Sequence, residues 1–452
     1  MSERTIGLAI YWGIWLILPA LIDGLTAFVQ IVLVTLNRLR VHRRPLPEPT
    51  EWPGVSIVIP VYNGEATLGG CLASLRQQHY PQEQLEVIVV DNGSTDHTAE
   101  VFQEQQRHPF RGQMHWISIA GRGKAYALNA GLHLASQPYL CNVDADTVVH
   151  PDALREMVRH FEADPQLGAA TGTIEVLPVP PEEQRDRIAF LIGECEFQEY
   201  LNAFWLGRQG QSLSHSLFTL AGAFSFFRRE VLLRTALYDK ETVSEDTKVT
   251  FNIRNQFGGE RLACIPEAIV YVTPTPSLAA LYSQRVRWQR GELEVAAANQ
   301  EMLDFNLLRL RGLALGRTLL VDHTLLFPRL VWTVLFPMLT FWGYPLSLIV
   351  GALIVIYLFY VVIAGLAAFT VYLMAPSAIR ARLNRSAWVV VILPAYQFVI
   401  FSFRLAGSII ALTTPADWRV QAPWVEVATA ARSLDEVWRH GLRNLQGLAH
   451  RR

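Results

Sequence analysis

The sequence has few of the features that mark disulfide-stabilised, metal-thiolate or nucleic-acid-binding proteins. Its 452 residues include only four cysteines, which are isolated and lack the CxxC or Cys/His spacing of a metal site. No disulfide framework is expected, and reduced thiols in a cytosolic domain are the simplest interpretation. The 39 basic and 40 acidic residues nearly cancel, giving a formal net charge of −1. Because nucleic-acid binding normally needs a basic face, no nucleic-acid partner is expected.

Charged residues are also scarce, at 17% of the chain, whereas 51% of the residues are hydrophobic and the apolar excess gathers at the two ends. The chain is longer than the roughly 250–300 residues that one hydrophobic core fills. We therefore expect an integral membrane protein with one soluble domain and with membrane lipids among its partners.

The first apolar run, Ile6–Leu36, predicts a membrane anchor. As a helix it would be about 46 Å long, against a hydrocarbon core of about 30 Å. It is too long for a signal-peptide core and lacks a basic leader and a small-residue cleavage site, so it should be retained. Asp23 inside it indicates either a functional intramembrane carboxylate or a kink near the interface. The arginines that follow the run place the next segment in the cytoplasm; they are Arg38, Arg40, Arg43 and Arg44.

Apolar strands alternate with amphipathic helices in the soluble part, after a proline-rich linker. Val55–Val61 and Leu85–Val90 are predicted buried strands, followed later by a strand at 170–179 and an edge strand at Arg261–Val272. This alternation predicts an α/β domain with a doubly wound, mostly parallel sheet. In such sheets ligands bind at the C-terminal ends of the strands.

Acidic residues follow two of the predicted strands. Asp91 either binds a ribose hydroxyl or the imide N–H of uracil, or caps a helix that begins near Thr95. Asp144 and Asp146 point to one side of an extended chain, so they repel one another unless a cation or a proton intervenes. Mg²⁺ or Mn²⁺ shared with a diphosphate fits such oxygen ligands, and a solvated turn is the alternative. Lys124, beside glycines, is a weaker candidate contact for a phosphate or a uracil edge.

Two later segments carry polar groups that fit catalysis. Ser244-Glu245-Asp246 opens a predicted helix, where its acidic residues cap the helix or where its aspartate acts as a general base. In the predicted helix Leu281–Glu294, an amide, a guanidinium and an indole share one face, from Gln284, Arg287 and Trp288. This face either clamps an anion and stacks a ring, or belongs to a surface helix whose tryptophan packs into the core.

Taken in order, these four segments resemble the D, DxD, (T/S)ED and QxxRW motifs of the membrane-embedded family 2 glycosyltransferases. That group includes cellulose, hyaluronan, chitin-oligosaccharide and poly-N-acetylglucosamine synthases. The resemblance covers about Ser56 to Trp288. It implies a GT-A-type fold, inverting transfer from a nucleotide-diphosphate sugar that is most often UDP-linked, and a Mg²⁺ or Mn²⁺ cofactor.

Carried over position by position, the resemblance assigns these residues to donor, metal and acceptor. Asp246, ionised at pH 7 near its ordinary pKa, would take the proton of the acceptor hydroxyl. Trp288 would lie under the acceptor sugar, with Glu245 beside the base. Asp144 and Asp146 would bind the metal. The residues that would contact the nucleotide-sugar are Asp91, Lys124, Asp144, Gln284 and Arg287.

The C-terminal third contains three more apolar segments, at about Thr324–Trp342, Leu346–Met374 and Ala387–Leu412. Together with the anchor, three spans would leave the tail outside, yet the tail is basic, which favours the cytoplasm. Either one segment is re-entrant or interfacial, or the count is wrong. Arg329 and Arg404 inside these runs would line a sugar channel, face protein or snorkel to the surface.

The sequence therefore predicts a membrane anchor with a basic linker at 1–45 and a cytosolic catalytic domain at 46–305 that ends in the QxxRW helix. Interfacial and transmembrane helices at 306–413 and a basic amphipathic tail at 414–452 follow. The predicted function is processive polymerisation of a UDP-sugar into a β-linked polysaccharide at the plasma or inner membrane, with passage of the product through the membrane helices. A single transfer to a membrane lipid and an inactive polysaccharide-binding or assembly subunit are the alternatives. Besides the growing glycan or lipid acceptor, an accessory secretion subunit is a candidate partner.

Overall fold

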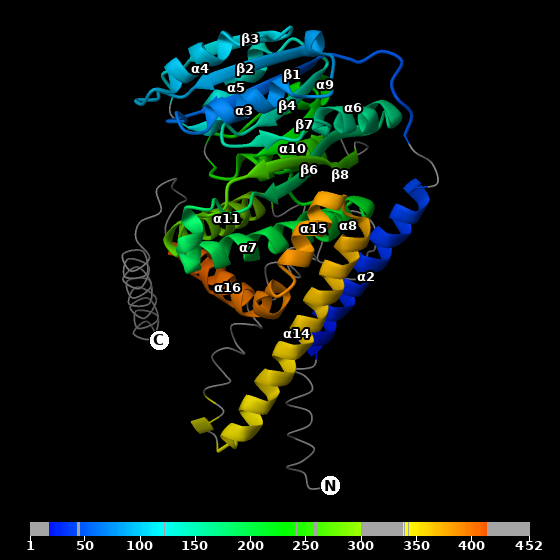
Figure 1. Cartoon of the computed structure of the whole chain (residues 1–452), viewed down its shortest axis with the longest axis vertical. Coiled ribbons are helices and arrows are strands. Elements are labelled where there is room, and N and C mark those ends of the chain that lie inside the picture. Colours follow the sequence, from blue (N-terminus) through cyan, green and yellow to red (C-terminus); the bar gives the residue numbers. More distant parts are fainter. Residues whose placement is uncertain are drawn as a thin grey trace, which may run out of the picture.

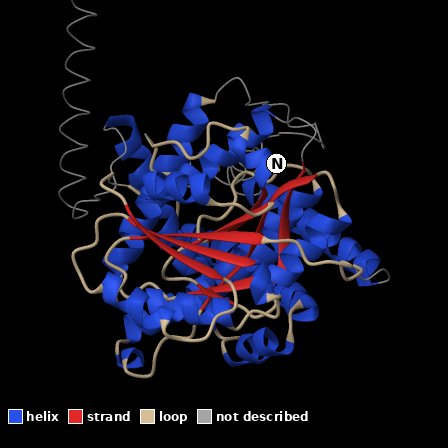
Figure 2. Cartoon of the chain, turned by 90° about the horizontal axis from the view of Figure 1, so that it is seen from above, coloured by secondary structure: helices blue, strands red, loops and turns tan. Residues whose placement is uncertain are grey.

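An eight-stranded sheet forms the centre of the molecule, with helices on both of its faces and further helices that extend away from one end (Figure 1, Figure 2). The structure is a computed structural model. It describes residues 18–42, 46–121, 123–240, 242–256, 261–299, 338, 340–341 and 343–413.

The strand order is β3-β2-β1-β4-β7-β6-β8-β5. β7 and β5 run antiparallel to their neighbours and the other neighbouring pairs are parallel, so the sheet is mixed but mostly parallel, as predicted. The strands are β1 (Val55–Val61), β2 (Leu85–Asp91), β3 (Gln113–Ser118), β4 (Tyr139–Val143), β5 (Val148–Val149), β6 (Leu167–Val176), β7 (Phe224–Arg228) and β8 (Arg261–Val272).

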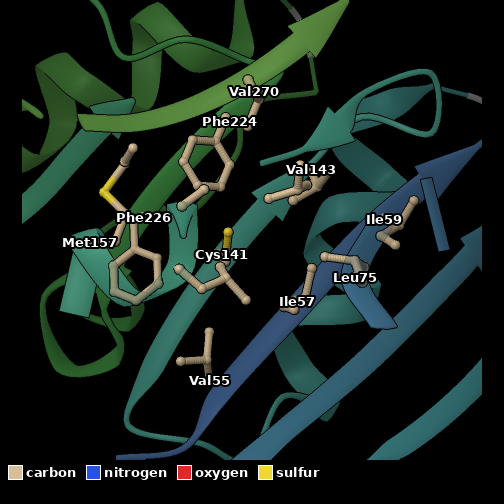
Figure 3. Packing of buried hydrophobic residues seen from close by; sticks show 14 of the residues in the cluster. Val55, Ile57, Ile59, Leu75, Cys141, Val143, Met157, Phe224, Phe226 and Val270 are labelled. Atoms are coloured by element: carbon tan, nitrogen blue, oxygen red, sulfur yellow. The ribbon is translucent and has the colours of Figure 1, made fainter. Parts of the chain in front are cut away.

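Both faces of the central strands are covered, which explains why their sequences are almost entirely apolar. Ile57 and Ile59 of β1 pack on one side, where Figure 3 places them near Leu75 of α3. Val58, between them, packs on the other side with residues of α5. The four cysteines are buried and unpaired by disulfides, as predicted. The three phenylalanines of β7 are fully buried and belong to the core; they are Phe224, Phe226 and Phe227.

The covering helices divide between the two faces according to the side chains that they bury. One face carries α3 (Leu68–Arg76), α4 (Thr98–Gln106) and α6 (Ala153–Ala163), and the other carries α5 (Lys124–Leu134), α9 (Arg229–Leu233) and α10 (Glu245–Gln256). Toward the extended end lie α7 (Arg187–Leu201), the π-helical segment η4 (Asn202–Arg208), α8 (Gln209–Leu213) and α11 (Leu278–Ala298); short 3₁₀ turns are η2 (Gln82–Gln84) and η3 (Glu183–Arg185).

The structure corrects two details of the predicted sheet. β8 was predicted to be an edge strand, but it lies between β6 and β5. β5 pairs through only Val148 and Val149, so sequence periodicity could not reveal it. The strand predicted at 170–179 is β6 and begins three residues earlier.

In the described part of the chain, four helices lie outside the α/β domain, namely α2 (Leu18–His42), α14 (Leu346–Met374), α15 (Ser377–Arg385) and α16 (Val389–Thr413). Among the described residues, two helical stretches are long and apolar enough to cross a membrane, Leu346–Met374 and Val389–Ala411. α2 and α14 run together away from the sheet (Figure 1). Asp23 of α2 accepts a hydrogen bond from Tyr360 of α14 at 2.7 Å, so this carboxylate has a partner inside the helix pair.

α16 takes a different course from α14. It lies beneath α7 and α11 (Figure 1), and it contacts both helices. Arg404 of α16 donates through Nε to Gln289 of α11 at 2.9 Å, so this arginine faces protein. Arg329, most of the predicted span at 324–342 and the tail at 414–452 fall outside the described residues.

Close packing of α5 on the sheet gives a testable prediction. A Cβ atom at Gly131 would lie 2.4 Å from Cγ1 of Val58, whereas a Cβ atom at Gly70 in α3 would meet nothing within 4 Å. We expect Gly131→Ala to cost roughly 1–3 kcal/mol through overpacking. Gly70→Ala should leave stability unchanged or raise it by about 0.5–1 kcal/mol. Thermal unfolding of the full chain in detergent measures this difference, and equal Tm values for the two variants would contradict the packing described.

Candidate active site

Lys124 stands at the C-terminal edge of the sheet because a glycine-rich turn starts α5 there. Gly123, just before it, has φ 126° and ψ 144°, which residues with a side chain rarely adopt. The Nζ atom of Lys124 lies 2.5 Å from Oδ1 of Asp144, which directly follows β4, and 3.6 Å from Oε1 of Glu245. One ammonium group therefore bridges two of the predicted motifs.

Asp246 is held in the first turn of α10 by backbone donors. Its carboxylate accepts hydrogen bonds from the N–H groups of Gly222 at 3.1 Å and Thr247 at 2.7 Å. A Cβ atom at Gly222 would lie 3.2 Å from Asp246 Oδ2 and 3.3 Å from Lys124 Nζ. The absence of a side chain at residue 222 thus keeps the space between the base and the lysine open. Lys124, Asp144, Glu245 and Asp246 are called the lysine–carboxylate cluster below.

The electrostatics of the cluster depend on burial and on the lysine. Burial alone would lower the pKa of Lys124, but the carboxylates of Asp144 and Glu245 outweigh it and raise that pKa above its ordinary value. Burial raises the pKa of Glu245 to about 7, with Lys124 opposing. Burial also raises the pKa of Asp246, again against the effect of Lys124, so this group does not keep the ordinary pKa that the sequence led us to expect. Glu245 is buried and faces Lys124.

Asp91 closes the end of β2 and does not cap a helix. Its carboxylate accepts hydrogen bonds from the backbone N–H of Ser94 at 2.9 Å and from Oγ of Ser118 at 2.8 Å. α4 begins only at Thr98, and its N-cap residue is His97, so the capping alternative for Asp91 is wrong. An ionised carboxylate has about four acceptor positions, so two remain for a ligand.

In the Asp-Ala-Asp turn, the two carboxylates differ in how available they are to a metal ion. Asp146 is exposed, whereas Asp144 already contacts Lys124. Partial desolvation and the neighbouring charge of Asp144 raise the pKa of Asp146. Among the described residues, no three His, Cys, Asp or Glu side chains are grouped for a metal ion. Two carboxylates fit Mg²⁺ or Mn²⁺ only if substrate phosphates and water supply the other ligands, which is how Mg²⁺ is commonly bound.

α11 presents the predicted amide, guanidinium and indole. Ser277 caps the helix by accepting the N–H of Ala280 at 3.2 Å. Trp288 is 38% exposed, so the alternative that it packs into the core is wrong. Gln284 is half-buried and its Oε1 atom has no hydrogen-bond partner within the described part of the chain. Arg287 is also half-buried, which leaves part of the guanidinium accessible.

A second glycine brings α11 against the start of α10. A Cβ atom at Gly291 would lie 2.0 Å from Oγ of Ser244, which precedes Asp246 by two residues. Trp288 is one turn before Gly291 on α11. The structure thus brings α11, which carries the indole, against the start of α10, which carries Glu245 and Asp246, although the two segments are about forty residues apart in the chain.

Sequence reasoning missed Arg285, which lies inside the same motif. This buried arginine places Nη2 2.7 Å from Glu199 Oε2 and 3.6 Å from Glu196 Oε1, both on α7. Its guanidinium carbon lies 4.7 Å from the ring centroid of Trp288. The hydroxyl of Tyr396, on α16, donates to the same Glu199 oxygen at 2.9 Å. The sequence signal that could have revealed a buried cation was the pair Glu196 and Glu199, which lie three residues apart on α7 among aromatic residues.

Comparisons with known proteins agree with this architecture. Residues 56–235 match the family model described as glycosyl transferase family 2. Curated relatives include the poly-β-1,6-N-acetyl-D-glucosamine synthase of Staphylococcus epidermidis, 31% identical over 244 residues that make up 54% of this chain and 55% of the relative. The corresponding synthase of Staphylococcus aureus strain COL is 29% identical over 260 residues, 57% of this chain and 59% of the relative. The aligned part is thus less than two thirds of the length of these relatives.

A solved structure resembles the chain more completely in fold. The mannosyltransferase PcManGT from Pyrobaculum calidifontis, in complex with GDP-Man and Mn²⁺, aligns over 87% of this chain and 99% of its own, with a TM-score of 0.51 and 21% identity. The sheet, the order of the motifs and the family match lead to one conclusion. The chain carries a glycosyltransferase family 2 domain with a GT-A-like α/β fold.

Proposed function

We propose that the protein is an inverting, processive glycosyltransferase that polymerises a sugar from a UDP-sugar into a β-linked polysaccharide. The observation that carries this proposal is the lysine–carboxylate cluster at the edge of the sheet, together with the packing of α11, which carries the exposed Trp288, against the start of α10. N-acetylglucosamine is the proposed sugar because the curated relatives are N-acetylglucosamine polymer synthases. The acceptor is the growing glycan.

Donor binding uses both sides of the site. Asp91 accepts a hydrogen bond from uracil or ribose with its remaining lone pairs. Arg287 and Gln284 approach the diphosphate from α11, where the guanidinium and the amide NH₂ group donate to its oxygens. Lys124 contacts the diphosphate from the opposite side, while Asp144 keeps the ammonium in place. These three cationic or polar groups neutralise the charge that grows on the leaving group.

Asp144 and Asp146 would hold a Mg²⁺ or Mn²⁺ ion together with the diphosphate. The bound ion would supply Lewis-acid stabilisation of the leaving diphosphate. Asp146 is exposed, whereas Asp144 must share its charge with Lys124.

The transfer itself needs one base. The acceptor hydroxyl attacks the anomeric carbon, its proton passes to the Asp246 carboxylate, and the bond from that carbon to the diphosphate oxygen breaks, releasing UDP with inversion. The N–H groups of Gly222 and Thr247 orient the carboxylate. Glu245, which is buried, acts through Lys124 and Asp246 and not as a surface for the acceptor.

Trp288 provides a flat apolar surface beneath the acceptor ring. Arg285 lies against the indole, and Glu199 fixes Arg285 through a 2.7 Å ion pair. Because Arg285 is buried, loss of Glu199 would weaken the compensation of its charge. Arg285 is therefore proposed to be a positioning residue for the acceptor platform.

For the membrane, we propose a multi-pass protein of the cell membrane whose catalytic domain, at 46–305, faces the cytoplasm between the anchor at 1–45 and the helices at 306–413. The apolar exposed surface of α14 supports a span. α16 makes polar contacts to α7 and α11, which supports an interfacial position for it. With α16 on the cytoplasmic side, the basic tail at 414–452 also lies in the cytoplasm, which resolves the conflict in the predicted topology.

UDP release by the purified full chain tests the function. A panel of UDP-sugars is offered with Mg²⁺ or Mn²⁺ and with a chelator, and the product is sized on a gel. We expect release from UDP-N-acetylglucosamine, dependence on the metal, and product of high molecular mass. A single sugar added to a lipid would establish the lipid-modifying alternative instead. No release with any donor or acceptor would support an inactive assembly subunit.

Asp246→Asn tests the base. The amide keeps the shape of the side chain but cannot accept the proton, so we expect kcat to fall by about 10²–10⁴. Binding of the UDP-sugar, measured by calorimetry, should be retained. Glu230→Gln, an exposed substitution on α9, is the matched control and should leave both quantities unchanged.

The pH dependence of the wild-type rate supplies a second readout for this base. The pKa of Asp246 is raised above its ordinary 3.8, so the carboxylate becomes protonated at a higher pH than usual. The rate should therefore fall on acidification with an apparent pKa above 3.8. A rate of Asp246→Asn close to that of the wild type, with the same acid limb, would remove Asp246 from the mechanism.

Trp288→Ala tests the acceptor platform. We expect KM for a glycan acceptor to rise at least tenfold while KM for the UDP-sugar changes by less than twofold. Tyr396→Phe removes one hydrogen bond to Glu199 and should produce a weaker change in the same direction. Equal losses for donor and acceptor would show that Trp288 only supports the fold.

A further inference from the structure

A cavity of about 1030 Å³ lies away from the candidate active site, and none of the predicted site residues lines it. Its walls come from α6, the ends of β6 and β8, and from α2, α14 and α15, the helices seen together in Figure 1. Trp205, Ile269 and Met374 give it apolar surface. Its volume is in the range of pockets that hold a small molecule.

The cavity lies where the membrane-facing helices meet the soluble domain. Met374, in its wall, is the last residue of α14, a 29-residue apolar helix whose surface is mostly exposed. Arg38, in the opposite wall, lies in the last turns of α2. If α14 crosses the bilayer as proposed, the cavity is at the level of the lipid head groups. The inference rests on that membrane placement and not on catalysis.

Most charges in the cavity wall are matched within the protein. Arg159 Nη1 lies 2.8 Å from Glu156 Oε1, and Arg382 Nη2 lies 3.0 Å from Glu194 Oε1. Arg38 pairs with Glu267, and His150 lies 3.8 Å from Asp152. After these pairs are removed, the wall retains one carboxylate and one guanidinium, those of Glu175 and Arg385.

Glu175 is the unmatched carboxylate. It lies near the end of β6 and is only 8% exposed, yet it has no hydrogen bond or ion pair among the described residues. Burial raises its pKa to about 7, although the charge of Arg382 opposes this. A buried carboxylate without a donor is costly. A ligand that brings a positively charged N–H group would remove that cost.

Arg385 is the unmatched cation. It is the last residue of α15, it is exposed, and it has no acidic partner within the described ranges. A guanidinium offers a planar set of donors that matches phosphate oxygens. The cavity thus presents one unsatisfied acceptor of cationic N–H groups, one free phosphate-binding group and an apolar wall.

We propose that this cavity binds the head group of an ethanolamine phospholipid, with the ammonium at Glu175 and the phosphate at Arg385. The apolar wall formed by Met374 and Ile269 receives the glycerol and the start of the acyl chains. Choline phospholipids lack N–H donors and cannot satisfy Glu175. Phosphatidylglycerol, an anionic lipid without an amine, brings no cation to this carboxylate.

Lipid competition on the full chain tests the proposal. The protein is reconstituted with equal amounts of phosphatidylethanolamine, phosphatidylcholine and phosphatidylglycerol, and the lipids that remain bound after detergent extraction are measured by native mass spectrometry. We expect phosphatidylethanolamine to be enriched at least fivefold over both other lipids. Glu175→Gln should abolish its preference over phosphatidylcholine, and Arg385→Gln should weaken retention of all three.

Matched variants separate this effect from misfolding. Arg380→Gln changes an exposed arginine on the same helix that does not line the cavity, and Glu230→Gln changes an exposed glutamate elsewhere. Both should bind lipid like the wild type. If Glu175→Gln fails to fold by its Tm, the exposed Arg385→Gln still decides the phosphate contact, and the lipid ratio of the wild type still decides the preference.

A soluble head group shows whether the cavity binds a membrane phospholipid or a free metabolite with the same phosphate and ammonium groups. Glycerophosphoethanolamine should compete for the site only weakly, because it lacks the acyl chains that the apolar wall receives. Competition as strong as that of the lipid would assign the site to a free metabolite and overturn the lipid proposal. Enrichment of phosphatidylglycerol, no enrichment, or enrichment unaffected by both substitutions would also overturn it. None of these readouts requires turnover, so a failure of the lipid proposal can be distinguished from a failure of the proposed function.

Discussion

The ammonium of Lys124 holds together acidic groups that would otherwise repel one another. Asp144 and Glu245 contact the ammonium directly, and Asp246 lies close enough for the charge of Lys124 to lower its pKa. Burial favours the protonated form of the two carboxyl groups in α10, and the lysine acts against that tendency. Lys124 thereby favours the ionised form of the proposed base, Asp246, against the effect of burial on its pKa. Two glycines make room for the lysine: Gly123 adopts the backbone conformation that precedes it, and Gly222 has no side chain that would crowd the ammonium.

α11 connects that cluster to the rest of the molecule. Through Gly291 it approaches the residues before Asp246, and through Arg285 it is tied to the glutamates of α7. On its other side it meets α16, where Gly407 allows the helices to approach so closely that a Cβ atom there would lie 3.1 Å from the Val286 carbonyl oxygen. The exposed face of α11, with Trp288, is therefore supported from three directions. A platform fixed in this way can orient an acceptor without moving itself.

Much of the fold could be predicted from the sequence because the relevant signals are local. The boundaries of β1 and α14 match the predicted ones because both are continuous apolar runs bounded by polar or helix-breaking residues. Three of the motifs could be placed at strand or helix ends, and the fourth inside a helix, for the same reason. β7, which inserts antiparallel between β4 and β6, could not be placed, because its paired neighbours are up to about ninety residues away in the sequence. Arg285 was missed because its role depends on the position of α7, which no pattern within α11 reveals.

α16 shows most clearly what hydropathy cannot decide. Its stretch Val389–Ala411 is apolar enough to cross a membrane, as α14 is. In α14 the large side chains point outward, whereas α16 uses Tyr396 and Arg404 to bind helices of the catalytic domain. Polar side chains in lipid are costly unless they are paired, and these two are paired with Glu199 of α7 and Gln289 of α11. These contacts are the basis for the proposed interfacial position of α16. Because Glu199 also holds Arg285 against Trp288, the same side chains support both the proposed acceptor platform and the proposed position of α16.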